Sequence, residues 1–267
     1  MFQKQIGSTV VEVSHKRVEY PNSSIYYNHI HSHCEMLLFI SGKANYNIDG
    51  QMFSPSPYDL LFIPAATYHY LMPTDSIPYE NYVIGVDPRI IKKEHYGKLF
   101  SPPLMLNIKN DQMLLDFFTR LDLYAKSYSV SDFDICTRAL ISELITYCNY
   151  HKDTLNSAAG ESNQLIDGII DFIDAHIEEP LDADMIATNF LLSKSYVQNI
   201  FSAHMHIGLK KYIMQKKIYS ASIDLSNGMT PNAVCEKYNF GDYTSFYRLY
   251  KRIFDISPSV GRIRNND

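Results

Sequence analysis

Three histidines alternate along HIHSHCE, residues 29–35, and a glutamate follows them. Residues two apart in an extended strand project from the same face, so this spacing predicts one surface shared by His29, His31, His33 and Glu35. Imidazoles and a carboxylate can hold a divalent transition metal with open coordination positions. The same groups can form hydrogen bonds around a small polar ligand. A purely structural histidine cluster is the third interpretation, and the residues alone leave all three open.

A second pattern, a weak internal repeat, lies in the C-terminal part of the chain. The stretch DMIATNFLLSKSYVQNIFSAH, which begins at Asp184, is similar to NAVCEKYNFGDYTSFYRLYKR, which begins at Asn232. Apolar residues match at an offset of 48 before a central break and 49 after it: Ile186 and Ala187 with Val234 and Cys235, Leu192 with Phe240, then Val197 with Phe246 and Phe201 with Tyr250. The second copy therefore has one extra residue in its turn.

Each copy has the pattern of a helix-turn-helix: a short apolar helix, a break, a polar cap and a second helix. The predicted caps are Ser193 and Asp242, and the second copy begins with Thr230 as N-cap and Pro231 in the first turn. Between the copies, residues 208–228 form one continuous helical pattern. One rigid helix can hold two DNA-reading helices, called readers below, about 34 Å apart. This is one turn of B-DNA, so the two readers can enter successive major grooves.

The net charge is −5, but its distribution along the chain is uneven. Residues 163–192 carry seven acids and no Lys or Arg, whereas residues 193–267 carry eleven bases and five acids, so the two stretches have net charges of −7 and +6. A local basic segment can dock a phosphate backbone in a protein that is acidic overall, because salt screens each charge beyond roughly 8 to 10 Å. The alternative from charge alone is a solvated helix face.

Residues 1 to about 106 have the pattern of β structure: short apolar or alternating runs such as MLLFI and DLLFIP, separated by turn residues. The pair Asp49 and Gly50 predicts a hairpin turn. From about 111 to 151 the apolar period predicts two helices, with Ser131 or Asp132 as the cap of the second. Their stripes are Leu114, Phe117, Phe118, Leu121 and Tyr124, then Phe133, Cys136, Leu140, Leu144, Tyr147 and His151.

The chain has no apolar stretch of the length that a secretory signal or a membrane span requires. Its four cysteines lie far apart and form no CxxC pair. This usage predicts reduced thiols rather than disulfides or a structural zinc site. We expect a soluble, cytoplasmic protein with no membrane association.

The last hundred or so residues resemble the DNA-binding domain of the AraC/XylS family of bacterial transcription regulators. The resemblance is carried by LSKSYVQNIF, by KYIMQKKIYSA and by NFGDYTSFYRLYKR followed by SP and Arg262. The sequence departs from the family pattern at five positions: Asn239, Asp255 and His206 stand where glycines are usual, Ser202 replaces a usual lysine and Gly261 a usual tyrosine. No expected core position is affected, but the change at 202 would remove a phosphate contact.

The resemblance implies that the second helix of each copy reads bases. The predicted contacts are Lys194, Ser195, Gln198 and Asn199 in the first copy, and Tyr243, Thr244, Ser245, Tyr247, Arg248 and Lys251 in the second. Gln and Asn side chains can pair bidentately with adenine, and Arg248 suits guanine or phosphate. Lys194, Lys251 and Arg252 suit phosphates.

The N-terminal part is similar to the cupin-like effector domain that precedes the DNA readers in this family. His29, His31 and Glu35, followed by Gly42, fit one cupin motif; Pro64 and His69 fit part of the second, with Tyr58 and Ala66 where glycines are usual. The resemblance favours an effector pocket over a metal site, so we expect no metal and no cofactor. The predicted pocket residues are His29, His31, His33, Glu35, Tyr46 and His69.

Together these patterns predict an α+β protein of two domains. Residues 1–152 would form a cupin-like β-barrel with a helical pair, residues 153–164 a linker, and residues 165–267 an all-α domain with helix-turn-helix units at about 182–203 and 231–253. The predicted function is an AraC-type regulator that binds double-stranded DNA and responds to a small effector, with a sugar as the first candidate. A homodimer through helices 112–151 and contact with RNA polymerase are also expected, and no enzymatic activity is expected.

Two other functions fit parts of the sequence. A cupin enzyme that carries helical repeats would hold stoichiometric metal and lose its turnover to a chelator. An architectural protein would bend DNA with little sequence preference, which the amide-bearing reading helix argues against. A regulator instead predicts a sequence-selective double site and an affinity that falls with salt.

Overall fold

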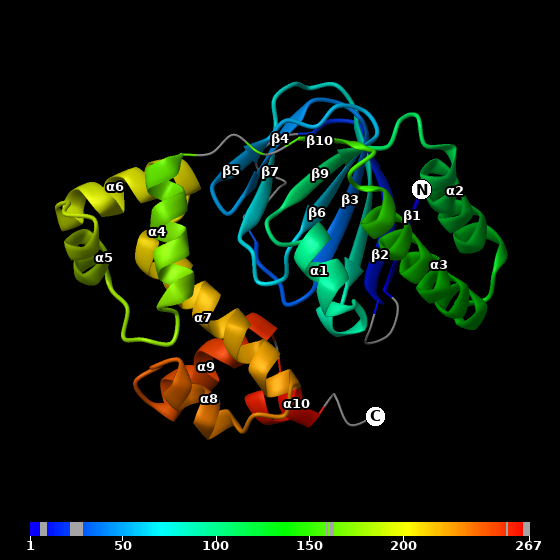
Figure 1. Cartoon of the computed structure of the whole chain (residues 1–267). Coiled ribbons are helices and arrows are strands. Elements are labelled where there is room, and N and C mark those ends of the chain that lie inside the picture. Colours follow the sequence, from blue (N-terminus) through cyan, green and yellow to red (C-terminus); the bar gives the residue numbers. More distant parts are fainter. Residues whose placement is uncertain (6–9, 22–28, 159, 161–162, 255, 264–267) are drawn as a thin grey trace. The chain divides into compact units, whose positions relative to one another are not determined.

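The computed structural model describes residues 1–5, 10–21, 29–158, 160, 163–254 and 256–263. The chain folds into two compact units, Met1–His29 with His33–Glu161 and Ile30–Ser32 with Ser162–Asp267 (Figure 1). The described strands all lie in the first unit, and the described elements of the second unit are helices. The predicted division into a β-rich N-terminal part and a helical C-terminal part is confirmed.

The described part of the first unit contains ten strands: β1 (Phe2–Gln5), β2 (Val10–Val18), β3 (Cys34–Ser41), β4 (Ala44–Ile48), β5 (Gln51–Phe53), β6 (Asp59–Ile63), β7 (His69–Pro73), β8 (Tyr79–Val86), β9 (Leu104–Asn107) and β10 (Asn156–Ala158). They form a larger sheet in the order β1-β2-β8-β3-β6-β9-β10 and a smaller sheet in the order β5-β4-β7. Neighbouring strands are antiparallel, for example β3 and β8 with Glu35 opposite Gly85.

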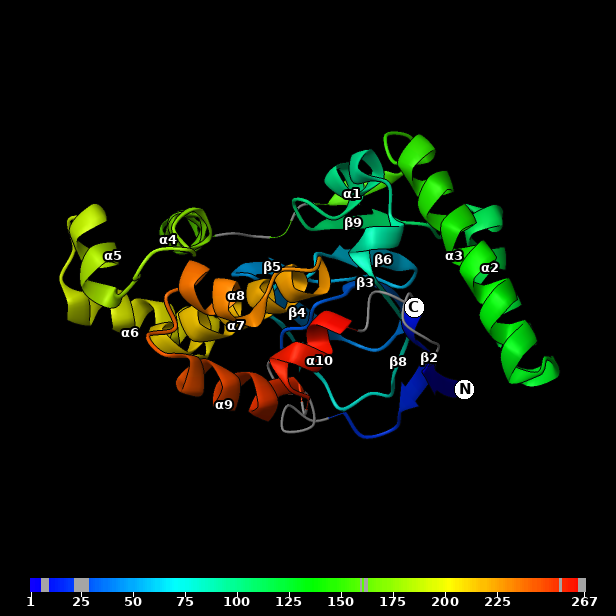
Figure 2. The ribbon, with the colours of Figure 1, turned by 90° about the horizontal axis from the view of Figure 1, so that it is seen from below.

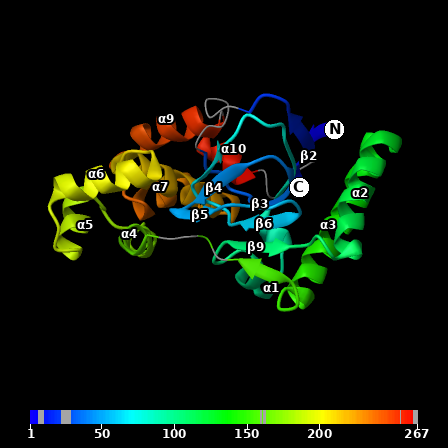
Figure 3. The same cartoon turned by 90° about the horizontal axis from the view of Figure 1, so that it is seen from above.

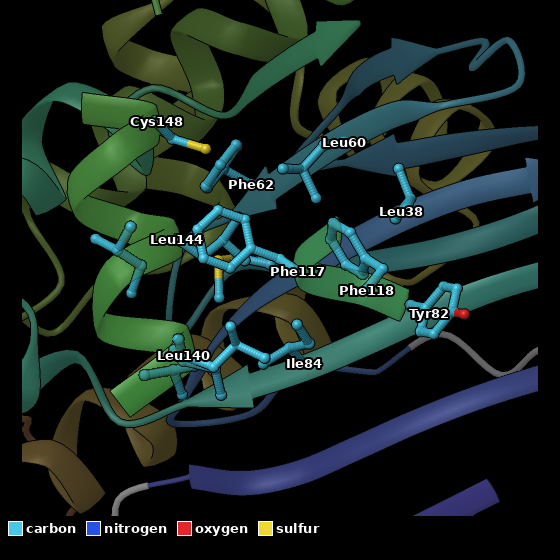
Figure 4. Packing of buried hydrophobic residues seen from close by; sticks show 14 of the residues in the cluster. Leu38, Leu60, Phe62, Tyr82, Ile84, Phe117, Phe118, Leu140, Leu144 and Cys148 are labelled. Atoms are coloured by element: carbon cyan, nitrogen blue, oxygen red, sulfur yellow. The ribbon is translucent and has the colours of Figure 1, made fainter. Parts of the chain in front are cut away.

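The larger sheet is buried on both faces. The helices α1 (Lys93–Leu99), α2 (Gln112–Ser127) and α3 (Val130–His151) pack on one face, and a short 3-10 helix, η1 (Pro88–Ile90), precedes them. Side chains alternate along β3, so that Leu38 packs with Phe117 and Phe118 of α2 (Figure 4), whereas Leu37 and Phe39 pack with the smaller sheet. This double burial explains why MLLFI is a continuous apolar run.

The predicted hairpin at Asp49 and Gly50 is confirmed. These residues connect β4 to β5, with Ile48 opposite Gln51. Both have positive φ, 44° at Asp49 and 84° at Gly50. A two-residue turn of this kind matches the twist of the flanking strands, and it favours the Asp-Gly pair for that reason.

The predicted barrel is not confirmed. In the described part of the chain, strand pairing gives two separate sheets, and no pairing joins β1 to β10 to close the larger one. Short strands with regular turns are expected of sandwiches and of barrels alike, because both bury alternate side chains. The sequence pattern therefore could not decide between the two.

Both predicted helices of the 111–151 region are present, but α3 begins earlier than expected. Its N-cap is Ser129, not Ser131 or Asp132: the Asp132 N–H donates to Ser129 Oγ at 3.2 Å. The buried face also differs from the predicted stripe, because His151 is exposed and Tyr147 is half-buried. A helix that packs on a sheet buries a wider stripe than one residue per turn. The additional buried residues are Thr137, Ile141, Ile145, Cys148 and Asn149.

Part of the predicted linker forms a strand. Asn156–Ala158 is β10, and it pairs with β9 at the edge of the larger sheet, with Ser157 opposite Leu106. An edge strand offers unpaired backbone groups that any short extended segment can bond. The composition of these three residues therefore gave no sign of a strand.

The second unit is built from seven described helices: α4 (Gln164–Ala175), α5 (Ala183–Asn189), α6 (Lys194–Met205), α7 (Leu209–Ser226), α8 (Pro231–Lys237), α9 (Tyr243–Phe254) and α10 (Pro258–Ile263). Thr230 caps α8 with Pro231 in its first turn, as predicted. No helix in the part of the chain that the structure describes is both long and apolar enough to cross a bilayer.

The internal repeat is present in the structure as two helix-turn-helix units, α5–α6 and α8–α9. The turns begin alike: the Leu192 N–H donates to Ala187 O at 2.9 Å, and the Phe240 N–H donates to Cys235 O at 3.2 Å. Residues 191 and 239, also 48 apart, both have positive φ, at 54° and 52°. The second turn then contains one more residue than the first, as predicted.

The central helix α7 carries both units, one near each end. Tyr212, near its start, contacts Phe201 of α6 at a ring-centroid distance of 5.1 Å. Ile218 and Leu225, further along, pack with Phe246 of α9. Figures 2 and 3 show α6 beside the first turns of α7 and α9 beside its later turns.

Candidate functional site

The first candidate reading helix, α6, has a polar exposed side. Ser193 caps it, because the Tyr196 N–H donates to Ser193 Oγ at 3.2 Å. The helix buries Val197, Phe201 and Met205. Its exposed side carries the predicted contact residues Lys194, Ser195, Gln198 and Asn199. The two amides have the hydrogen-bonding groups that pair with adenine in a major groove.

Lys194 is paired with an acid of its own helix-turn-helix. Its Nζ lies 2.6 Å from Asp184 Oδ2. The hydrogen bond and the charge of Asp184 raise the pKa of Lys194, so the side chain stays charged. A phosphate contact would have to replace this partner, and we expect Lys194 to contribute less to DNA binding than an unpaired lysine.

The second candidate reading helix, α9, is capped by Asp242. The Asp242 carboxylate accepts hydrogen bonds from the Ser245 N–H at 2.8 Å and from Ser245 Oγ at 2.7 Å. These bonds, together with the charge of Arg248, lower the pKa of Asp242. The helix buries Phe246 and Tyr250. Of the predicted contact residues, Tyr247 is half-buried, and the exposed ones are Tyr243, Thr244, Ser245, Arg248 and Lys251.

A groove between α6 and α7 brings two lysines close to the reading amides. It is lined by Gln198, Asn199, Ser202, Gly208, Leu209, Lys210, Lys211 and Met214. Both lysines are exposed, and they supply positive charge beside Ser202, where the family usually has a lysine. From the sequence, Lys210 and Lys211 were expected only as part of the connecting helix. The signal that could have identified them was a basic pair directly after the break at Gly208.

Hydrogen bonds connect the two helix-turn-helix units. Lys217 of α7 is 4% exposed, and its Nζ donates to Glu179 O at 2.5 Å and to Tyr238 O at 2.9 Å. Glu179 precedes α5 and Tyr238 follows α8, so one ammonium group joins both units. Asn239 Nδ2 adds a bond to Glu178 O at 2.5 Å. Burial lowers the pKa of Lys217. Helical periodicity could not predict this role.

The predicted effector residues of the first unit are only partly brought together. His29, Glu35 and His69 each offer a ligand atom, and these atoms lie within 4.8 Å of one another. The chain bends at residues 32 and 33 before β3 begins, which ends the expected alternation. The His33 ring instead lies over Gly85, where an added Cβ would meet His33 Cδ2 at 2.8 Å. The expected single face therefore does not include His33.

The two remaining predicted effector residues are His31 and Tyr46. His31 belongs to the segment Ile30–Ser32 of the second unit and is half-buried. Tyr46 of β4 is buried in the core between the two sheets, where its hydroxyl bonds to that of Tyr79. The Tyr79 hydroxyl also accepts from Asn81 Nδ2 at 2.8 Å. The polar end of Tyr46 is thus satisfied by protein groups, and its role toward an effector stays a prediction.

Electrostatics single out His69. It is 2% exposed, and its Nε2 lies 3.5 Å from Glu35 Oε2. Burial lowers the pKa of His69, but the hydrogen bond and charge of Glu35 outweigh burial and leave the pKa above its ordinary value. The buried His69 imidazole and the buried Glu35 carboxylate thus form a polar pair inside the first unit.

Comparison with known proteins identifies both parts of the chain. Residues 11–130 match the model of the AraC-like ligand binding domain, and residues 186–264 match that of a helix-turn-helix domain.

The regulatory protein SoxS of Salmonella typhimurium is 32% identical over 102 residues, which are 38% of this chain and 95% of SoxS. The multiple antibiotic resistance protein MarA of the same organism is 28% identical over 101 residues, 38% of this chain and 80% of MarA. The solved structure of ToxT from Vibrio cholerae O395 covers 97% of this chain and 100% of ToxT at 10% identity and a TM-score of 0.42, a likeness too low to support a conclusion. The matched domains and the identity with SoxS show that the chain belongs to the AraC family of DNA-binding transcription regulators, with an N-terminal ligand-binding domain.

Proposed function

We propose that this regulator places α6 and α9 in successive major grooves on one face of a DNA duplex. The observation that carries the proposal is the repeat of a helix-turn-helix on one connecting helix. Each copy leaves a polar face of its second helix exposed. With 18 residues, α7 is about 27 Å long at 1.5 Å per residue. Readers held near its two ends suit grooves that are about 34 Å apart.

In this proposal, the exposed residues of the two units contact different groups of the DNA. Gln198 and Asn199 read adenine, and Arg248 reads guanine, because these side chains match the edges of those bases bidentately. Lys210, Lys211 and Lys251 contact phosphates and set the register of the protein on the duplex. The Ser245 hydroxyl donates its proton to Asp242, so its oxygen is available to a DNA donor as an acceptor.

The N-terminal unit supplies control in the same proposal. A small polar effector binds the cupin-like domain near His29, Glu35 and His69, and a sugar remains the first candidate. It acts only if its affinity differs between two states of the regulator. Such a regulator works in the cytoplasm beside the chromosome, where it can contact RNA polymerase.

A homodimer through α2 and α3 completes the proposal. These helices expose apolar side chains at Val130 (80%), Ile135 (64%) and Leu123 (53%). Exposed apolar residues on neighbouring helices favour association with a second copy. Sedimentation of the full chain over a range of concentrations tests this part: a dimer is expected, and the charged variant Ile135→Glu is expected to dissociate it. A wild-type monomer at every concentration would remove the dimer from the proposal.

Selection of bound fragments from random duplex DNA tests the DNA-reading proposal. We expect one enriched double site with adenine in one half. Loss of Gln198 through Gln198→Ala should relax the preference at one position and cost about 1 to 3 kcal/mol of binding free energy. The matched control Lys43→Ala removes a charge from the first unit and should leave the selected site unchanged. Enrichment of no sequence, or equal effects of both variants, would contradict the proposal.

A further inference from the structure

The chain that leads from the first unit to the second is attached to both sheets of the first unit. Asn156–Ala158, which is β10, pairs with β9 at the edge of the larger sheet. Gly160, two residues further on, lies against β5, an edge strand of the smaller sheet. An added Cβ there would meet Phe53 Cε2 at 2.8 Å and Gln51 Cβ at 3.0 Å. We call Asn156–Ala158 and Gly160 the docked segment.

The contact at Gly160 reaches the interior of the first unit. Phe53 is 1% exposed and belongs to the apolar cluster between the two sheets, together with Tyr46 and Met105. Met105 is also the residue of β9 that lies opposite Ala158 of β10. Side chains in such an interior are closely packed, so a displacement of one is transmitted to its neighbours. The position of the docked segment therefore depends on how this cluster is packed.

The fit at Gly160 is set by space and not by backbone conformation. The φ angle of Gly160 lies outside the left-handed region, so other residues could adopt its backbone. A three-residue strand at the edge of a sheet can open locally while the rest of the sheet stays folded, because few hydrogen bonds hold it. The docked segment thus combines a close contact with a short attachment.

We propose that the docked segment is a latch that sets the length of the connection to the second unit. The helix α3 ends at His151 with Lys152 as its C-cap, and α4 follows its N-cap Asn163. While the segment is docked, the connection is residues 161–163, which span at most about 11 Å when extended. After release, the connection is residues 153–163, which span at most about 40 Å. Release therefore lengthens the tether of the second unit.

The latch deepens the proposed control of DNA binding, and it rests on the proposed function only in its link to an effector. A ligand that binds between the sheets and displaces Phe53 favours the released state, because its affinity for the two states differs. A longer tether lets the second unit reach DNA over a wider range of distances from the first unit. A permanently paired edge strand, which never opens while the chain is folded, is the competing explanation.

Hydrogen–deuterium exchange of the full chain, without DNA or ligand, tests the latch. In the wild type, the amides of Asn156–Ala158 should be protected, but less than those of β3 in the middle of the larger sheet, because the segment opens locally. Gly160→Val should lower their protection at least about tenfold and leave β3 unchanged. The matched control is Gly97→Val, at an exposed glycine of α1 whose added Cβ meets nothing within 4 Å. It should keep the wild-type protection of the docked segment.

A double-mutant cycle tests whether the latch acts through Phe53. Phe53→Leu removes the ring atoms Cε2 and Cζ that a side chain at position 160 would meet. Gly160→Val should therefore cost less protection in the Phe53→Leu chain than in the wild type. Small-angle scattering, at one protein concentration, measures the reach of the tether. The largest dimension of Gly160→Val should exceed that of both the wild type and Gly97→Val.

Several results would overturn the latch. Wild-type protection of β10 equal to that of β3 would indicate a permanently paired strand, and no protection would indicate that the segment does not dock. Unchanged protection in Gly160→Val, equal losses in both chains of the cycle, or an unchanged largest dimension would each contradict the coupling between Phe53 and the tether. These measurements use neither DNA nor a ligand, so their failure and the failure of the DNA-reading proposal are distinguishable.

Discussion

At the scale of single residues, several residues that are not glycine have the left-handed backbone conformation that glycine adopts most readily. Tyr58, Ala66, His206 and Asn239 stand where the AraC and cupin patterns usually have glycine, and all four have positive φ, between 52° and 71°. Left-handed backbone costs roughly 1 to 2 kcal/mol for a residue with a Cβ. The turn geometry is therefore retained although these residues disfavour it. Comparison with the family motifs identified these positions from the sequence.

His206 offers a direct test of this strain. It follows α6 with φ 53° and ψ 27° and is exposed. We expect His206→Gly to raise the free energy of unfolding by up to about 1 kcal/mol, because glycine adopts this conformation without a steric cost. The control His204→Gly lies two residues earlier inside the helix, and it should lower stability by about 1 kcal/mol. Denaturant unfolding measures both; a loss of stability in His206→Gly would contradict the account.

The cap of α9 predicts a pH dependence. The pKa of Asp242 is lower in the folded chain than its ordinary value of 3.8, so its contribution to stability is complete above that value and is lost as pH falls through the folded pKa. Asp242→Ala should be less stable than the wild type at pH 7. The difference should shrink below about pH 4. Denaturant unfolding at several pH values checks this, and a difference that is constant down to pH 2 would be incompatible with it.

Residue roles were predictable where a local rule applied. Ser193, Asp242 and Thr230 were all identified as caps, because a polar residue before an apolar period has one favourable use. The positions of His33 and Lys217 were not predictable. The first depends on a bend that breaks the strand alternation, and the second on backbone carbonyls that converge from segments far apart in the sequence.

At the scale of elements, Lys217 fixes how the two helix-turn-helix units are related. We expect Lys217→Met to lower the free energy of unfolding by about 1 to 3 kcal/mol, because Glu179 O and Tyr238 O lose a buried donor. Each 1.4 kcal/mol that is lost from the coupling between the two helix-turn-helix units should lower the affinity for a double DNA site about tenfold. Tolerance of altered spacing between the half-sites should increase.

Lys216→Met is the control for that measurement. Lys216 neighbours Lys217 and is also buried, but its ion pair is with Asp174 of α4, at 2.9 Å. It therefore connects α7 to α4. We expect Lys216→Met to keep the spacing preference of the wild type, as measured by band shift on a series of duplexes. A relaxed spacing preference in both variants, or in neither, would argue against a coupling role for Lys217.

Element types followed from periodicity, whereas element boundaries and sheet closure did not. The repeat was identifiable because each copy must bury the same apolar positions, and its extra turn residue shifted the offset from 48 to 49. The start of α3 at Ser129 and the edge strand β10 depend on backbone hydrogen bonds that almost any residue can make. The same holds for the two sheets found in place of a confirmed barrel. Strand pairing decides whether a sheet closes, and the side-chain pattern does not encode strand pairing.

At the scale of the whole molecule, the proposed function requires that the two reading helices engage one duplex together. The connecting helix and the Lys217 bonds hold them in a fixed relation, so the account predicts a strict spacing between half-sites. Binding of a selected double site should weaken strongly when about five base pairs, half a helical turn, are inserted between its halves, because one reader then faces away from its groove. Insertion of a full turn should also weaken binding, since the readers cannot separate. Equal affinity for the original and the half-turn duplex, measured at one salt concentration, would contradict the central claim.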